Sequence, residues 1–117
     1  MSNQKKKHFF MVFANPLPGT EEEFNRWYNE QHVPDLLKLP NYVAAQRFEL
    51  SAHQYWDNPH PQKYLVIYEI HGDDLQASLD SLHRALENGD IAKSASFDWD
   101  TMATHVYSAI SDRILAQ

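Results

Sequence analysis

Three side chains in the first third of the chain are spaced to act together in acid–base chemistry. Tyr28, His32 and Asp35 follow one another at i, i+4 and i+7, so an ideal helix places them on one side. Pro34 lacks a backbone N–H, which predicts that the helix kinks or stops near His32. A helix C-terminus and a nearby carboxylate both favour a protonated imidazole and bring its proton exchange towards neutral pH. We therefore expect His32 to act as a general acid–base; the alternative is a ring that caps carbonyls at the kink.

A second group of residues has the chemistry to hold a small molecule. Arg47 lies on the next expected strand, where its guanidinium would bind a carboxylate or enolate oxygen, and an ion pair with Glu49 is the alternative. Phenols can donate to an oxyanion and indoles can stack on an aromatic ligand, but such side chains also serve as ordinary core. The further binding candidates are Trp27, Tyr68, Trp99, His105 and Tyr107.

The composition excludes several kinds of chemistry. The 117 residues contain no cysteine, which rules out a disulfide framework, a thiolate zinc site, an iron–sulfur cluster and a cysteine nucleophile. No metal-ligand spacing such as His-Glu-x-x-His is present, so we expect neither a metal nor a tightly bound cofactor. The net charge of -6 leaves the run Lys5–Lys7 as the one basic cluster, which argues against nucleic acid as a partner.

The N-terminal stretch imitates a signal peptide, but a first strand explains it better. The apolar run after Lys7 is short and ends at Asn15-Pro16 without a cleavage site. No later stretch approaches the roughly 20 apolar residues of a membrane-spanning helix. We expect one cytoplasmic domain over residues 1–117, with a flexible basic N-terminus at 1–7, a tail at 111–117 and no membrane partner.

Hydrophobic periodicity and turn residues predict four strands and two helices. Thr20 starts the first helix as an N-cap hydroxyl, with Glu23 at the third helical position as in a capping box. Gly72-Asp73-Asp74 and Asn88-Gly89 mark the two ends of the second helix. The strands are expected at 8–14, 42–53, 63–71 and 102–110, with the third apolar on both faces.

This order of elements predicts an α+β fold of the ferredoxin-like type. In this βαββαβ arrangement a four-stranded antiparallel sheet carries both helices on one face. The third and fourth strands are rich in apolar residues on both sides, so the helix-free face of a monomer would be a large apolar patch. A second copy packed sheet to sheet would cover it with an interface on the order of 2,000 Å² or more. We therefore predict a homodimer that forms a closed or nearly closed barrel.

One segment resembles a known family. Residues 27–37 read WYNEQHVPDLL and, with Pro40, Arg47 and Phe48, resemble the signature of the EthD-like branch of the dimeric α+β barrel superfamily. The pattern is an aromatic pair, a His-x-Pro step, a small loop and a strand. This chain has Pro40-Asn41 where such chains often have Pro-Gly, and asparagine also tolerates left-handed dihedrals. The motif covers residues 24–48, and the order of elements extends a weaker likeness over nearly the whole chain.

The resemblance implies a cavity between sheet and helices that takes small, often aromatic or polyketide-like molecules. The superfamily includes cofactor-free monooxygenases, polyketide cyclases, lactone isomerases, dehydratases and haem-degrading enzymes, so the fold does not select a reaction. We predict a cofactor-independent enzyme of the isomerase, cyclase or lyase type in which His32 moves protons. The alternatives are a cofactor-free or haem-dependent monooxygenase and a non-catalytic ligand-binding or stress-response module.

Overall fold

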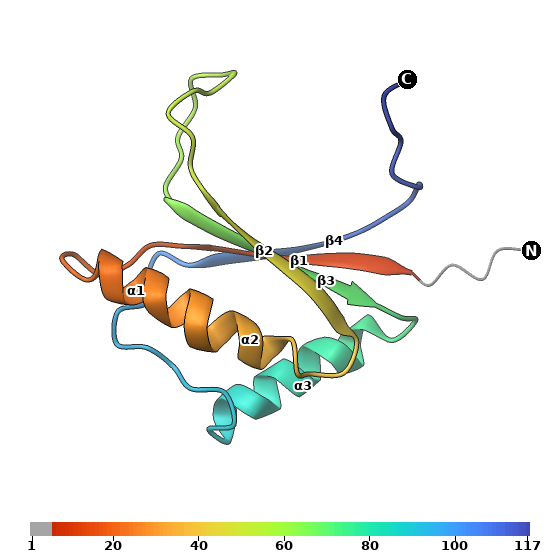
Figure 1. Ribbon diagram of the computed structural model, residues 1–117, viewed down its shortest axis with the longest axis horizontal. Helices are drawn as coiled ribbons and strands as arrows, with labels where there is room; N and C mark the ends of the chain where they lie inside the picture. Colours follow the sequence, from red (N-terminus) through yellow and green to blue (C-terminus); the bar gives the residue numbers. More distant parts are fainter. Residues whose placement is uncertain (1–5) are drawn as a thin grey trace, which may run out of the picture.

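In the part of the chain that this computed structural model describes, residues 6–117, four antiparallel strands form one sheet with the helices on one face (Figure 1). The strand order is β2-β3-β1-β4, so β3 and β1 are central. This is the predicted ferredoxin-like arrangement. The elements are β1 (Lys7–Ala14), α1 (Glu21–Trp27), the π-helical turn η1 (Tyr28–His32), α2 (Val33–Leu36), β2 (Tyr42–Glu49), β3 (Tyr64–His71), α3 (Leu75–Glu87) and β4 (Ala103–Ser108).

Side chains alternate between the two faces of the central strands. Every second residue of β3 from Tyr64 to Ile70 is buried against the helices, and the residues between them are half-buried on the other face. Strand pairing carries this alternation across the sheet, because Phe10 lies opposite both Tyr68 on β3 and Val106 on β4. The helix-free face, called the outer face below, carries Phe9, Met11, Phe13, Phe48, Leu65 and Ile67.

The first helix begins where the sequence predicts, but without the predicted capping box. α1 starts at Glu21, directly after Thr20. The Thr20 hydroxyl donates to the Leu17 carbonyl at 2.7 Å and makes no cap hydrogen bond, because the preceding turn engages it. Three glutamates in the first turn still favour the N-terminal end of the helix dipole.

The turn before β2 contains the one departure from the EthD-like pattern. Asn41 has a φ of +73° and is the one non-glycine residue with a positive φ among residues 6–117. Asparagine therefore serves the left-handed position that glycine usually takes. A bulge between Tyr42 and Ala44 then shifts the register of β2 against β3. Because of this shift, Arg47 pairs opposite the buried Val66. Arg47 therefore lies on the face of the sheet that the helices cover.

The second predicted helix is confirmed as α3. The Asp74 carboxylate accepts a hydrogen bond from the Ala77 N–H at 3.0 Å, which satisfies one free donor of the first turn. Asn88 caps the other end, and Gly89 follows with a φ of +82°. Leu82 and Ala85 lie on the buried side that packs towards the sheet.

Two segments without regular structure, called the arms below, project away from the helices (Figure 1): residues 50–63 and 109–117. β2 ends at Glu49 and not at His53 as predicted. The backbone hydrogen bond from Leu50 to Lys63, at 2.7 Å, closes the ladder, and Pro59 and Pro61 supply no donors beyond it. Lys7 already belongs to β1, which shortens the N-terminal segment expected at 1–7, and residues 1–5 of that segment lie outside the described residues.

Candidate functional site

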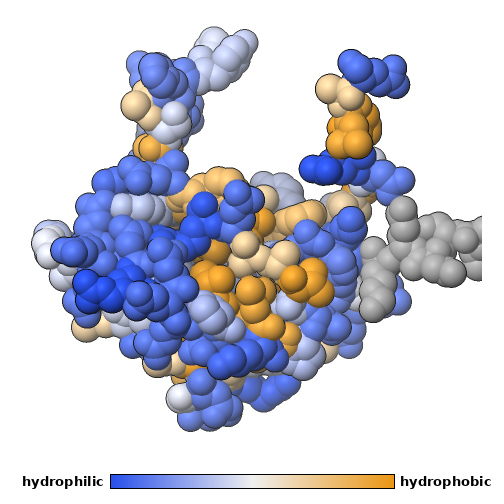
Figure 2. Space-filling model, viewed as in Figure 1, coloured by the Kyte–Doolittle hydropathy of each residue, from blue (hydrophilic) through white to orange (hydrophobic). Residues whose placement is uncertain are grey.

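A cavity of about 320 Å³, called the main cavity below, lies between the helices and the sheet. Its volume is at the small end of the range for ligand pockets, about 300 to 1,000 Å³. Figure 2 shows apolar side chains gathered in the middle of the molecule, beside the helices. The predicted site residues in its lining are Trp27, Tyr28, His32, Tyr68 and Trp99. The other lining residues are Phe10, Val12, Leu36, Leu79, Leu82, His83, Leu86, Lys93, Phe97, Met102, Thr104 and Val106.

Three buried side-chain polar atoms in the described chain lack a hydrogen-bond partner, and all three belong to residues that line this cavity. They are Trp27 Nε1, His32 Nδ1 and the Tyr68 hydroxyl. Leaving a buried donor or acceptor unpaired costs about 1–3 kcal/mol, so each such group in a folded protein requires an explanation. Neighbouring atoms cover all three, so a ligand in the cavity would pair with them only after a small movement of their side chains.

The local helix geometry explains why Trp27 and His32 meet. α1 passes into the wider turn η1, where the Val33 N–H donates to the carbonyl of Tyr28, five residues back. Pro34 has no N–H and its ring crowds the preceding turn, which favours such a widening. Residues i and i+5 then lie above one another, and the rings of Trp27 and His32 stack with centroids 4.3 Å apart. The sequence predicts a kink or a stop near His32. The helix is distorted there, as the widened turn η1, but it continues through α2, so His32 does not lie at a helix end.

His32 is neutral in this site, contrary to the sequence-based expectation. Burial lowers the pKa of its imidazole from 6.5 to about 4, and the charge of Asp35 offsets this only in part. The continuing helix also removes the C-terminal dipole that was expected beside the ring. The imidazole packs edge-on against Tyr28, with centroids 5.2 Å apart. A neutral imidazole has one acceptor nitrogen, so His32 is in the form that can accept a proton from a ligand, and its lowered pKa makes it a weak base.

The two phenols of the cavity are hydrogen-bond donors. Burial raises the pKa of Tyr28 and of Tyr68 well above the usual range, so both stay protonated. The Tyr68 side chain is fully buried on the central strand β3. The Tyr68 hydroxyl and the Trp27 N–H are thus two neutral donors that belong to the walls of the main cavity, as His32 does. Such donors can stabilise negative charge that develops on a ligand oxygen.

Asp35 does not join the predicted cluster with Tyr28 and His32. Its carboxylate lies 3.6 Å from Lys38 Nζ and outside the lining of the main cavity. The wider turn η1 rotates the positions that follow it, so Asp35 at i+7 no longer lines up with Tyr28. Asp35 therefore acts on His32 through its charge alone.

Arg47 also differs from its expected role. Its terminal nitrogens donate to the side-chain oxygens of Asn29 at 2.9 Å and of Asn25 at 2.8 Å, and Glu49 is not its partner. The guanidinium carbon lies 4.7 Å from the centroid of the Tyr28 ring. Arg47 is absent from the lining of the main cavity. It fastens α1 and η1 to β2 and so positions the ring that His32 packs against.

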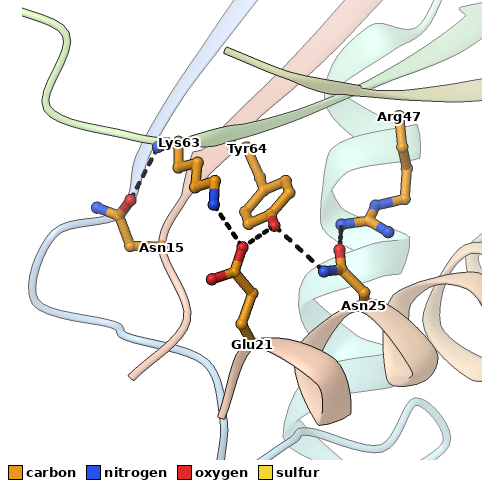
Figure 3. A network of polar contacts seen from close by, with 6 residues as sticks. All are labelled: Asn15, Glu21, Asn25, Arg47, Lys63 and Tyr64. Atoms are coloured by element: carbon orange, nitrogen blue, oxygen red, sulfur yellow. Dashed lines mark hydrogen bonds and ion pairs between the residues drawn. The ribbon is translucent and has the colours of Figure 1, made fainter. Parts of the chain in front are cut away.

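A network of polar side chains extends this attachment to β3 (Figure 3). Asn25 donates to the Tyr64 hydroxyl at 3.2 Å, and that hydroxyl donates to Glu21. Lys63 completes the network by an ion pair with Glu21 at 2.6 Å. Helical periodicity places Asn25 and Asn29 on the water-facing side of α1, so sequence reasoning missed them. Their i, i+4 spacing, which lets one guanidinium reach both side chains, was the available signal.

Two predicted binding residues lie on the other side of the sheet. His105 and Tyr107 pair with Met11 and Phe9 on the outer face, away from the main cavity. Their neighbours Thr104 and Val106 line the cavity instead. The expectation that His105 and Tyr107 share a cavity with His32 is therefore corrected. Strand alternation is the reason, because a shift of one residue moves every side chain to the opposite face.

The segment between α3 and β4 supplies several walls of the cavity. Phe97 is buried and its ring centroid lies 4.5 Å from that of Trp99. An isolated bridge to Pro16 holds this segment against the chain that precedes α1. Sequence reasoning selected Trp99 but missed Lys93, since irregular segments have no periodicity that assigns side chains to a face. It also missed Met102, which was expected to begin the last strand but lies just before β4.

The described residues show neither a metal site nor a membrane-spanning element. Within residues 6–117, no group of three or more His, Cys, Asp or Glu side chains is arranged to hold a metal ion. No helix in this range is long and apolar enough to cross a lipid bilayer.

The buried, neutral His32 is expected to make the fold less stable in mild acid. Below pH 6.5 the unfolded chain binds a proton on this imidazole, whereas the folded chain does so only near pH 4. Between about pH 7.5 and about pH 5, this group should lower the free energy of unfolding by about 2 kcal/mol. Urea unfolding of wild type and His32→Phe at both pH values measures the difference. His60→Phe, in the exposed arm, is the control, and an equal pH dependence in wild type and His32→Phe would contradict the prediction.

Comparison with known proteins supports the fold. No protein-family model and no curated protein matches this chain. An ethyl tert-butyl ether D (EthD) family protein from Bacillus halodurans C-125 is similar in structure, with a TM-score of 0.55 and 11% identity over 90% of this chain and 99% of that chain. A proposed monooxygenase from Shewanella loihica PV-4 has a TM-score of 0.52 and 12% identity, over 96% and 100%. A protein of unknown function from Nitrosomonas europaea has a TM-score of 0.51 and 12% identity, over 99% and 100%. The predicted resemblance to EthD-like proteins is thus confirmed at the level of the fold.

Proposed function

We propose that this protein is a small enzyme that moves a proton on an aromatic or polyketide-like molecule in the main cavity, without a tightly bound cofactor. His32 is the base, and Tyr68 and Trp27 are the donors that stabilise negative charge on the ligand. The observation that carries the proposal is that three unpartnered buried polar atoms belong to the walls of one apolar cavity. The reaction class is enolisation, as in an isomerisation, cyclisation or dehydration.

The walls of the cavity favour this kind of ligand. Trp27, Phe97 and Trp99 present flat rings on which a planar molecule can stack. Burying a permanently charged base among these apolar side chains would cost free energy. His32 avoids this cost because it is neutral until it accepts a proton. Proton transfer to a positioned base contributes about 10² to 10⁴-fold to a rate, and the low pKa of His32 restricts this contribution to a C–H group that is already strongly activated.

The proposal is tested by deuterium exchange from solvent into C1 of 2-tetralone, an aromatic ketone that enolises, followed by NMR. The wild-type protein should accelerate the exchange above the buffer rate. Val106→Trp should remove this acceleration by filling the cavity from the edge strand β4. Gln76→Trp, on the exposed side of α3, is the control and should keep the wild-type rate. No acceleration by wild type, or equal acceleration by Val106→Trp, would refute the proposal.

A second candidate is oxygenation of the same kind of molecule without a metal. The description of the Shewanella neighbour as a proposed monooxygenase favours it. A neutral base also favours it, since a carbanion formed by proton loss can react with oxygen. Uptake of dissolved oxygen during turnover separates this candidate from enolisation alone. The described lining offers one permanently charged side chain, Lys93, for the two propionates of haem, so it gives haem no specific support. Binding without exchange or oxygen uptake would indicate a non-catalytic module.

We also propose that two copies pair through their outer faces. A monomer would leave the apolar side chains of this face in water. The two arms flank the face (Figure 1). They expose further apolar residues, among them Trp56 at 71% and Ile114 at 88%. The arms bring the radius of gyration to 15.7 Å, where a compact chain of this length has about 13 Å. A second copy that packs between the arms would cover the outer face and the apolar residues of the arms.

A further inference from the structure

Among the described residues that line the main cavity, Lys93 is the one with a permanently charged side chain. It lies in the segment after α3, is exposed to solvent, and places Nζ 5.9 Å from the centroid of the Trp99 ring. None of the ion pairs in residues 6–117 includes it. Lys93 is therefore a cation at the edge of the cavity that forms no ion pair within the described part of the chain.

Lys93 also lines an adjoining hollow that contains other charged side chains. Trp27 and Lys93 line both the main cavity and this hollow, so they form the boundary between the two. The hollow also contains Glu23, Arg26 and Glu30. None of these three lines the main cavity, where no carboxylate is present among the described lining residues. Lys93 is therefore the one permanent charge that a ligand would meet among the described lining residues of the main cavity.

We propose that the ligand of the main cavity is an anion, with a planar apolar body and a carboxylate or similar acidic group that pairs with Lys93. The inference rests on the proposed function and adds the charge of its substrate. A planar body that stacks on Trp99 brings a terminal acidic group close to the Lys93 ammonium. The opposite end of the molecule is then directed inwards, to Tyr68 and His32.

Three naphthalene probes of matched shape test this charge preference by calorimetric titration of the full chain. 2-Naphthoate is anionic, 2-naphthalenemethanol is neutral and 2-naphthylmethylammonium is cationic. Wild type should bind the naphthoate about five- to tenfold more tightly than the alcohol, and the ammonium probe more weakly than the alcohol. The preference should shrink at about 1 M salt, where screening acts over about 3 Å.

Lys93→Met should bind the alcohol within twofold of wild type and lose the preference for the naphthoate. Lys6→Met makes the same change in net charge away from the cavity and should keep the preference, which excludes a long-range effect. Equal binding of naphthoate and alcohol by wild type, or a preference that survives in Lys93→Met, would overturn the anionic ligand and leave the proposed function standing. If wild type binds none of the three probes, both proposals fail together.

Discussion

Replacing His32 with phenylalanine should slow the exchange of 2-tetralone protons by about 10² to 10⁴-fold and leave binding of the ketone within a few-fold. Phenylalanine keeps a flat ring to stack on Trp27, which imidazole now does at 4.3 Å, but it has no nitrogen to accept a proton. NMR exchange rates and calorimetric titration with 2-tetralone measure the two quantities separately. His60→Phe, on the exposed arm, should keep the wild-type rate. A His32→Phe protein that exchanges as fast as wild type would exclude His32 as the base.

The pH dependence of the same exchange distinguishes a buried imidazole from an ordinary one. Burial lowers the pKa of His32 to about 4, so the base is already neutral at pH 5.5. The protein-dependent rate should therefore change by less than about twofold between pH 8 and pH 5.5. An imidazole with the ordinary pKa would lose about tenfold over this interval, because most of it would be protonated at the lower pH. A tenfold loss would show that the site is wetter in solution than the structure indicates.

Replacing Ile67 with aspartate should convert a dimer into a monomer. Ile67 lies in the middle of the outer face, opposite Met11 on one side and Gln46 on the other. A carboxylate there would lose its water in a sheet-to-sheet interface without gaining a partner, and that cost applies to both copies. Light scattering should report twice the 13.7 kDa chain mass for wild type and a single chain mass for the variant.

A second outer-face variant and a control variant test the dimer prediction further. Phe48→Asp places the same charge on the outer face of the edge strand β2, where the side chain is already 39% exposed, so its effect on the fold itself should be small. Gln76→Asp adds the charge on the exposed side of α3 and should leave the dimer intact. A wild-type monomer at micromolar concentration, or a dimer that persists in both outer-face variants, would disprove the proposed pairing.

The fold could be predicted from the chain because its signals are local. The Asp74 cap and Gly89 mark the ends of α3, and Asn41 supplies a left-handed turn from its own backbone preference. The site was predicted less well. Trp27, His32 and Tyr68 do line one cavity, but Asp35 and Arg47 serve other partners. The assignment of Asp35 assumed an ideal α-helix, which η1 interrupts, and the assignment of Arg47 considered a ligand or Glu49 but not Asn25 and Asn29.

Short-range patterns in the amino-acid order were enough to establish the order of the elements, the start of α1, both ends of α3 and the turn before β2, since each depends on residues a few positions apart. The three-dimensional packing established the rest: the stacking of His32 on Trp27, the neutral state of that imidazole and the face on which His105 lies. These features arise from the widened turn η1, from desolvation and from strand register. The desolvation and the register depend on contacts between segments far apart in the chain, whereas η1 is local but departs from the ideal α-helix that the residue spacing assumes.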